Sequence, residues 1–228
     1  TNSLKQRSLD NKVSTPAQKV SYLRRKIRRN PKDAIARVDL AHAHVLLGNN
    51  GPADRQISIA LRLAPNNRFV LRSATRFLLH SDQHDKAHST IRQASATEND
   101  PWLMSAEIAT AAVLERNSGL VPEGKRLVGS DNLAPLHKAE LASAIGTLEG
   151  QAGNDRSSRR FFHEALVDPT ENTIAQAEWV TRNLTPVDIQ DNHLQKPGTY
   201  EARARRKYHQ GDLQGALKQA RSWLKDQR

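Results

Sequence analysis

The stretch GNNGPADRQISIALRLAP, residues 48–65, contains the repeating unit of this chain. After the turn at Gly48, three apolar residues fall at helical spacing: Ala53, Ile57 and Ala60. Pro65 then ends the segment, because proline has no N–H to donate to a continuing helix. The pattern predicts one short helix with a narrow apolar stripe, on which the small alanines allow close packing against a neighbouring helix.

The same pattern returns further along the chain. Ala87, Ile91 and Ala94 follow the first set at an offset of 34 residues, which is the length of a tetratricopeptide repeat. The two units resemble that family at the following positions: Leu40, Ala41, Gly48, Ala53, Ile57, Ala60 and Pro65 in the first, and Ala74, Ala87, Ile91 and Ala94 in the second. The resemblance implies an all-α solenoid of antiparallel helix pairs, stacked into a right-handed superhelix.

Composition supports the same class. The chain has 228 residues, of which 37% are hydrophobic, so it can bury a core, and only 4% are aromatic, which favours closely packed helices over a β-sandwich. The absence of cysteine excludes disulfides and thiolate metal sites. No apolar run is long enough to span a membrane, and the polar start TNSLKQRSLD lacks the apolar core of a signal peptide, so we expect a cytoplasmic protein.

The chain divides into four parts. We expect a flexible arm over residues 1–15 and helical repeats over 16–183, including a capping helix from Pro16 and a degenerate third repeat whose second helix is interrupted by Gly124. In the fourth repeat Ser158, Phe162 and Ala165 replace the alanine, isoleucine and alanine, and Gly146 is the small residue in the middle of the first helix of that unit. Residues 184–197 form an irregular connection, and 198–228 a further helix pair that we expect to continue in a longer protein.

No motif positions a nucleophile, a general base or a phosphate, so we expect no enzyme, no cofactor and no metal. His80, His84 and His88 are four residues apart, but the turn-forming Ser81-Asp82-Gln83 separates the first from the others, and surface histidines are the expected interpretation.

We expect the partner-binding face to be formed by the first helix of each pair, as in the tetratricopeptide family. The residues placed on it are His42, Phe69, Arg72, Arg76, Leu79, Thr110, Arg205 and Tyr208. Arg72 and Arg76 lie one turn apart, so they can bind a carboxylate of an acidic segment, or instead pair within the protein or face water. The asparagine-and-lysine set that some members use to clamp a C-terminal carboxylate is not matched.

The leading hypothesis is a non-catalytic scaffold that holds another protein segment in this groove. The formal charge of +11, with basic clusters at residues 24–29 and 203–207, leaves nucleic-acid binding as the alternative, although such clusters also serve as solvated faces. A third possibility is the helical N-terminal part of a larger enzyme, secretion or defence component.

Overall fold

The computed structural model describes residues 15–227, and this part of the chain contains helices and no strand. The all-α prediction is therefore confirmed for the described residues. The predicted arm, residues 1–15, lies outside them except for Thr15, which caps the first helix. The chain divides into two compact units, of which one ends at Phe77 and the other runs from Leu78 to Gln227. No helix of the described residues is long and apolar enough to cross a membrane.

The first unit is built from three helices and most of a fourth: α2 (Pro16–Arg29), α3 (Ala34–Leu46), α4 (Asn50–Leu63) and α5 (Arg68–His80). Polar side chains fix where these helices begin. Thr15 and Gln18 form a reciprocal capping box at the start of α2, and Asp33 accepts a hydrogen bond of 2.8 Å from the Ala36 N–H at the start of α3. That N–H, together with Lys26 at 3.4 Å, holds the pKa of Asp33 below its ordinary value.

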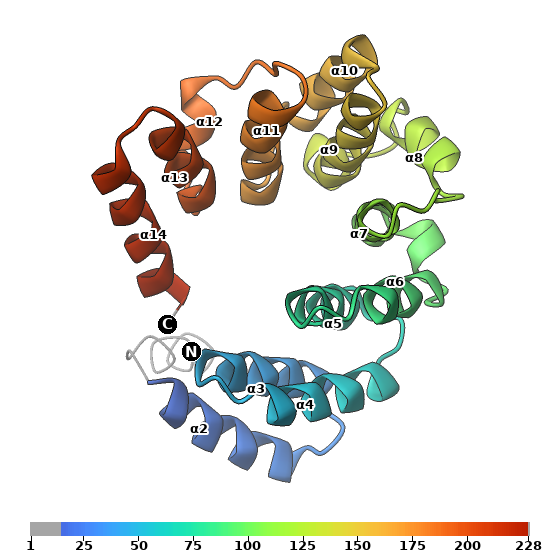
Figure 1. The fold of residues 1–228 in the computed structure, drawn as a ribbon. Coiled ribbons are helices and arrows are strands. Elements are labelled where there is room, and N and C mark those ends of the chain that lie inside the picture. The colour runs from blue at the N-terminus through green and yellow to red at the C-terminus, as the bar shows by residue number, and fades with distance from the viewer. Residues whose placement is uncertain (1–14, 228) are drawn as a thin grey trace, which may run out of the picture. The chain divides into compact units, whose positions relative to one another are not determined.

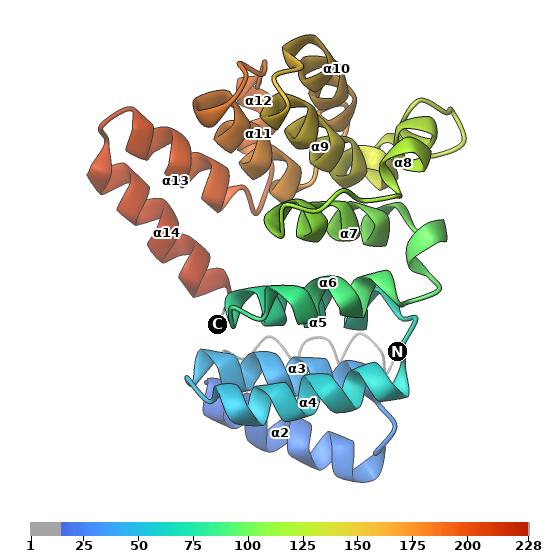
Figure 2. The same cartoon turned by 45° about the vertical axis from the view of Figure 1, so that its right-hand side comes forward.

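The predicted stripe forms the core of this unit. Ala53, Ile57 and Ala60 are at most 3% exposed and pack with Val38 and Ala41 of α3. Helix α3 lies against both α2 and α4 (Figure 2). The apolar stripe predicted for this helix is thus buried, as its spacing indicated.

The second unit contains the remaining helices: α6 (His84–Arg92), α7 (Pro101–Val113), α8 (Val121–Val128), α9 (Pro135–Gln151), α10 (Asp155–Ala165), α11 (Glu171–Asn183), α12 (Asp191–Gln195), α13 (Tyr200–His209) and α14 (Leu213–Gln227). A single 3₁₀ turn, η1 (Thr97–Asn99), precedes α7. Helices α7, α9, α11 and α13 contact one another in that order (Figure 1). Helices α8 and α10 pack against α9, and α14 packs against α13.

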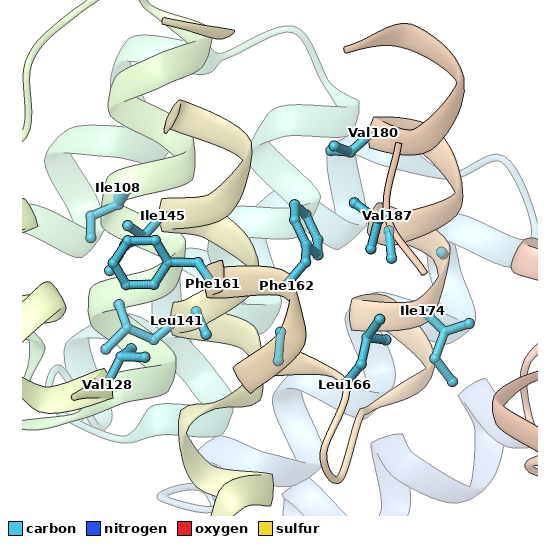
Figure 3. Packing of buried hydrophobic residues seen from close by; sticks show 14 of the residues in the cluster. Ile108, Val128, Leu141, Ile145, Phe161, Phe162, Leu166, Ile174, Val180 and Val187 are labelled. Atoms are coloured by element: carbon cyan, nitrogen blue, oxygen red, sulfur yellow. The ribbon is translucent and has the colours of Figure 1, made fainter. Parts of the chain in front are cut away.

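The core of the second unit is organised around two neighbouring aromatic residues of α10. Phe161 points toward Ile145, whereas Phe162 points toward the segment that carries Val180 and Val187 (Figure 3). The close approach of α9 and α10 depends on Gly146, since a Cβ at this position would lie 2.9 Å from Cδ2 of Phe162. The small residue predicted there is therefore required by packing.

Two local expectations differ from the structure. Helix α8 is short, as predicted, but it continues through Gly124. A Cβ added to Gly124 would lie only 3.1 Å from Cδ1 of Ile145 on α9. Gly124 thus allows a close helix contact and does not interrupt the helix. The connection 184–197 is also not wholly irregular, because residues 191–195 form the short helix α12.

Candidate functional site

A pocket of 470 Å³ lies on the row of first helices in the second unit. Helices α7, α9, α11 and α13 all contribute to its lining, which combines small apolar, hydroxyl and amide side chains. Its members are Ser105, Ala109, Ala112, Val113, Glu140, Ser143, Ala144, Thr147, Leu148, Gln151, Asn172, Thr173, Gln176, Trp179 and Arg205. The pocket is therefore a property of several consecutive helix pairs.

Helical periodicity explains how one helix serves both the core and the pocket. On α9, Leu141 and Ile145 are fully buried in the core, while Ala144, Thr147 and Gln151 lie at helical spacing on the pocket face. The same division applies to α11, where Ile174 and Ala177 are buried and Gln176 faces the pocket.

Hydrogen bonds between helices position the polar side chains of the pocket. The amide Nε2 of Gln176 donates to the hydroxyl of Thr147 at 3.1 Å, and that hydroxyl donates to the carbonyl of Ser143 at 2.9 Å. The amide Nδ2 of Asn172 donates to a carboxylate oxygen of Glu140 at 3.3 Å. A side-chain amide can make about four hydrogen bonds, so both amides keep further donor and acceptor capacity for a bound molecule.

The apolar part of the pocket offers contact area beside these amides. Val113 at the end of α7 is 55% exposed, and Trp179 on α11 is only partly buried. Tryptophan combines a large apolar surface with an N–H donor, a combination that is enriched at protein–protein interfaces.

The two charged residues of the lining have opposite signs, and each has a partner. Arg205 bonds Glu201 of the same helix at 2.7 Å through an Nη atom and 3.0 Å through Nε, whereas Glu140 accepts from Asn172 and Thr170. The lining as a whole is close to neutral. This arrangement suits an uncharged polar chain such as a peptide backbone better than a polyanion.

The sequence-predicted residues of the second unit have three different placements. Arg205 lines the pocket. Thr110 does not lie on an open face: it is 3% exposed, and its hydroxyl donates to the carbonyl of Ala106 at 2.9 Å. The residue before it, Ala109, faces the pocket, and one residue is a rotation of about 100° on a helix, which turns Thr110 inward. Tyr208 is 63% exposed and lies outside the pocket lining, edge-on to His209.

The other predicted residues are on α3 and α5. His42, Phe69 and Arg76 are exposed, while Arg72 and Leu79 are half-buried. Phe69, Arg72, Arg76 and Leu79 follow one face of α5, as the spacing predicted. They do not line the pocket of α7 to α13.

Two interactions of buried carboxylates with side chains of other helices were not predicted from the sequence. His88 is not a surface histidine: its Nε2 lies 3.1 Å from Oε1 of Glu107, and both side chains are almost fully buried. The hydroxyl of Ser118 bonds the other oxygen of Glu107, so the carboxylate joins α6, α7 and the loop after α7. Because Glu107 bridges histidine and serine, the histidine is not placed to activate the hydroxyl, as a nucleophilic site would require.

The second unpredicted pair joins α11 to α13. Nε of Arg206 donates to the buried carboxylate of Glu178 at 2.6 Å, and an Nη atom of Arg206 donates to Asp191 at 3.1 Å. Both pairs join residues of different helices, so local periodicity carries no signal for them. Within the described residues, no three histidine, cysteine or carboxylate side chains form a group able to hold a metal ion.

Comparison with protein-family models and with curated proteins found no match for this chain.

Proposed function

We propose that this protein is a non-catalytic scaffold that holds an extended segment of another protein in the pocket formed by α7, α9, α11 and α13. The proposal includes the architecture implied by the repeat spacing, a tetratricopeptide-like right-handed superhelix of antiparallel helix pairs. The observation that carries it is the pocket itself: four helices that contact one another in order all contribute side chains to one lining.

The chemistry of the lining supports a peptide as the occupant. An extended backbone presents alternating N–H and C=O groups, and the amides of Asn172 and Gln176, one helical turn apart on α11, can donate to and accept from such groups. Trp179 and Val113 supply apolar surface for a side chain of the bound segment. In tetratricopeptide proteins the first helix of each pair lines the groove, and under this proposal α7, α9, α11 and α13 are the first helices of their pairs.

Photo-crosslinking tests this proposal. A benzoylphenylalanine in place of Gln151, an exposed residue of the lining, should form discrete protein adducts in cells. The same group in place of Arg159, an exposed residue of α10 outside the lining, is the matched control and should not form them. Replacing Gln176 and Trp179 by alanine should remove the adducts. Adducts that persist in this variant, or that form equally at Arg159, would exclude the pocket as the binding site.

Nucleic-acid binding remains a second candidate because of one observation on α2. Arg24, Arg25, Arg28 and Arg29 are all exposed on that helix. The other basic cluster predicted from the sequence is largely occupied by intramolecular partners: Arg205 bonds Glu201, Arg206 bonds Glu178, and Lys207 bonds Asp212. Arg203 stacks over the ring of Tyr200. The polyanion alternative therefore depends on α2.

A further inference from the structure

The pocket of α7 to α13 has a polar end and an apolar end, and hydrogen bonds between its helices show which residues lie side by side. The amide of Asn172 on α11 reaches Glu140 on α9, and four residues later the amide of Gln176 reaches Thr147. The residue numbers rise together, so α9 and α11 run parallel. Trp179 is seven residues beyond Asn172 and therefore lies about 10 Å away, at the opposite end.

Three helices supply apolar side chains to the end that contains Trp179. The hydroxyl of Ser105 on α7 donates to the carbonyl of Glu140 at 3.0 Å, which places Ser105 at the polar end. Val113 comes eight residues later on α7, and Leu148 lies on α9 at the level of Trp179; both belong to the lining. An apolar side chain of a bound segment would lose its contact with water between these three residues.

Arg205 brings a positive charge to the apolar end. Its neighbour Arg206 bonds Glu178, the residue before Trp179, so Arg205 and Trp179 lie at the same level of the pocket. The carboxylate of Glu140 lies at the other end. An acidic residue of a bound segment is therefore favoured at the apolar end and disfavoured at the polar end.

The guanidinium of Arg205 can hold a second carboxylate beside Glu201. It bonds one oxygen of Glu201 through Nε and one Nη atom, and its side chain is 41% exposed. A guanidinium has five N–H groups, so three remain for another acceptor. The next residue shows the arrangement: Nε of Arg206 donates to Glu178 and an Nη atom donates to Asp191.

We propose that the segment held in this pocket carries an acidic residue beside a large apolar one, with the carboxylate on Arg205 and the apolar side chain on Trp179. The inference rests on the proposed function and adds the specificity of the pocket to it. A carboxylate bound by a guanidinium makes charge-assisted hydrogen bonds, which are stronger than those of neutral groups. One such residue is compatible with a lining that is nearly neutral as a whole.

A phage-displayed library of eight-residue peptides, held between fixed flanks and selected on the full chain, tests this inference. We expect the enriched peptides to share a large apolar residue with an aspartate or glutamate close to it. A labelled copy of the best peptide should bind Arg205→Gln roughly tenfold more weakly than the unchanged protein in fluorescence anisotropy. Replacing the acidic residue of the peptide by its amide should cause the same loss, and combining the two changes should add little.

Lys207→Gln is the matched control. Lys207 lies on the same helix, pairs with Asp212 at 2.8 Å and is 38% exposed, but it is outside the lining, so this change should leave binding unaltered. Equal weakening by the two variants, or enriched peptides without an acidic residue, would overturn the inference and leave the proposed function standing. A selection that enriches no peptide, or peptides that bind equally well after Gln176 and Trp179 are replaced by alanine, would refute both.

Discussion

Several tight helix contacts of this protein depend on residues that have almost no side chain. Ala53, Ala60 and Ala87 are fully buried, and Ala94 is 9% exposed. Gly124 and Gly146 serve the same purpose, because a methyl group at either position would crowd a side chain of the facing helix. The small-residue pattern that marks the repeat is thus explained by how near the helices lie to one another.

Gly146 allows a direct test of this argument. In Gly146→Ala the added Cβ would lie 2.9 Å from Cδ2 and 3.0 Å from Cε2 of Phe162, so the aromatic ring or helix α10 must move. We expect the free energy of unfolding to fall by about 1 to 3 kcal/mol, the usual cost of overpacking a core. Chemical denaturation followed by circular dichroism measures it.

The control for this change is another helical glycine. A Cβ on Gly51, in α4, would meet nothing within 4 Å, so Gly51→Ala should leave stability unchanged or raise it by up to about 1 kcal/mol. If Gly146→Ala is as well tolerated as Gly51→Ala, the close contact between α9 and α10 does not constrain the fold.

At the scale of helices, the sequence predicted well the features that depend on neighbouring residues, and poorly the contacts between side chains of different helices. Repeat spacing located the stripes of α4 and α6, and Pro16 marked a helix start that the structure confirms. It did not predict the buried bond between His88 and Glu107, because the two side chains come from different helices and neither departs from its local pattern. The pocket was missed in part for a local reason: Thr110 was chosen for the open face of α7, whereas the residue before it, Ala109, is the exposed one.

Helix α3 carries a titratable group whose environment is set by its two neighbours. His44 is 4% exposed, and burial lowers its pKa below the ordinary value of 6.5, with further lowering by Arg24 on α2 and Arg55 on α4. The unfolded chain therefore binds a proton at higher pH than the folded chain does. The folded state therefore keeps its full stability above pH 6.5, where His44 is neutral in both states, and loses stability as the pH falls from there toward the pKa of His44 in the folded chain.

We expect the free energy of unfolding to decrease as the pH is lowered below about 6.5. His44→Leu should make this decrease smaller without abolishing it, because the pKa of His193 is also lowered by burial. Arg24→Gln removes a cation that lowers the pKa of His44, so it should also make the loss of unfolding free energy at low pH smaller. Urea titrations at several pH values measure it, and a steeper decrease in His44→Leu would contradict the assignment.

At the scale of the whole molecule, the basic residues behind the formal charge of +11 differ in whether a carboxylate of the protein pairs with them. The cations of α13 are mostly bonded to carboxylates of their own unit. The arginines of α2 are exposed, and so are Lys218, Arg221 and Lys225 of α14. Net charge alone therefore overstates how much of the surface is available to a polyanion. The pocket, with its paired Glu140 and Arg205, is nearly neutral.

This distribution predicts how the protein meets nucleic acid. A fluorescent single-stranded oligonucleotide should bind weakly, with an affinity that falls as salt rises from 50 to 200 mM. If the four arginines of α2 supply the contacts, a plot of the logarithm of the association constant against log salt should have a slope no steeper than about −3. Replacing Arg24, Arg25, Arg28 and Arg29 with glutamate should remove this binding. The crosslinks from position 151 should be unaffected in that variant, because α2 contributes nothing to the pocket lining. If the α2 variant instead loses the protein crosslinks, the partner binds through the basic helix and not through the pocket.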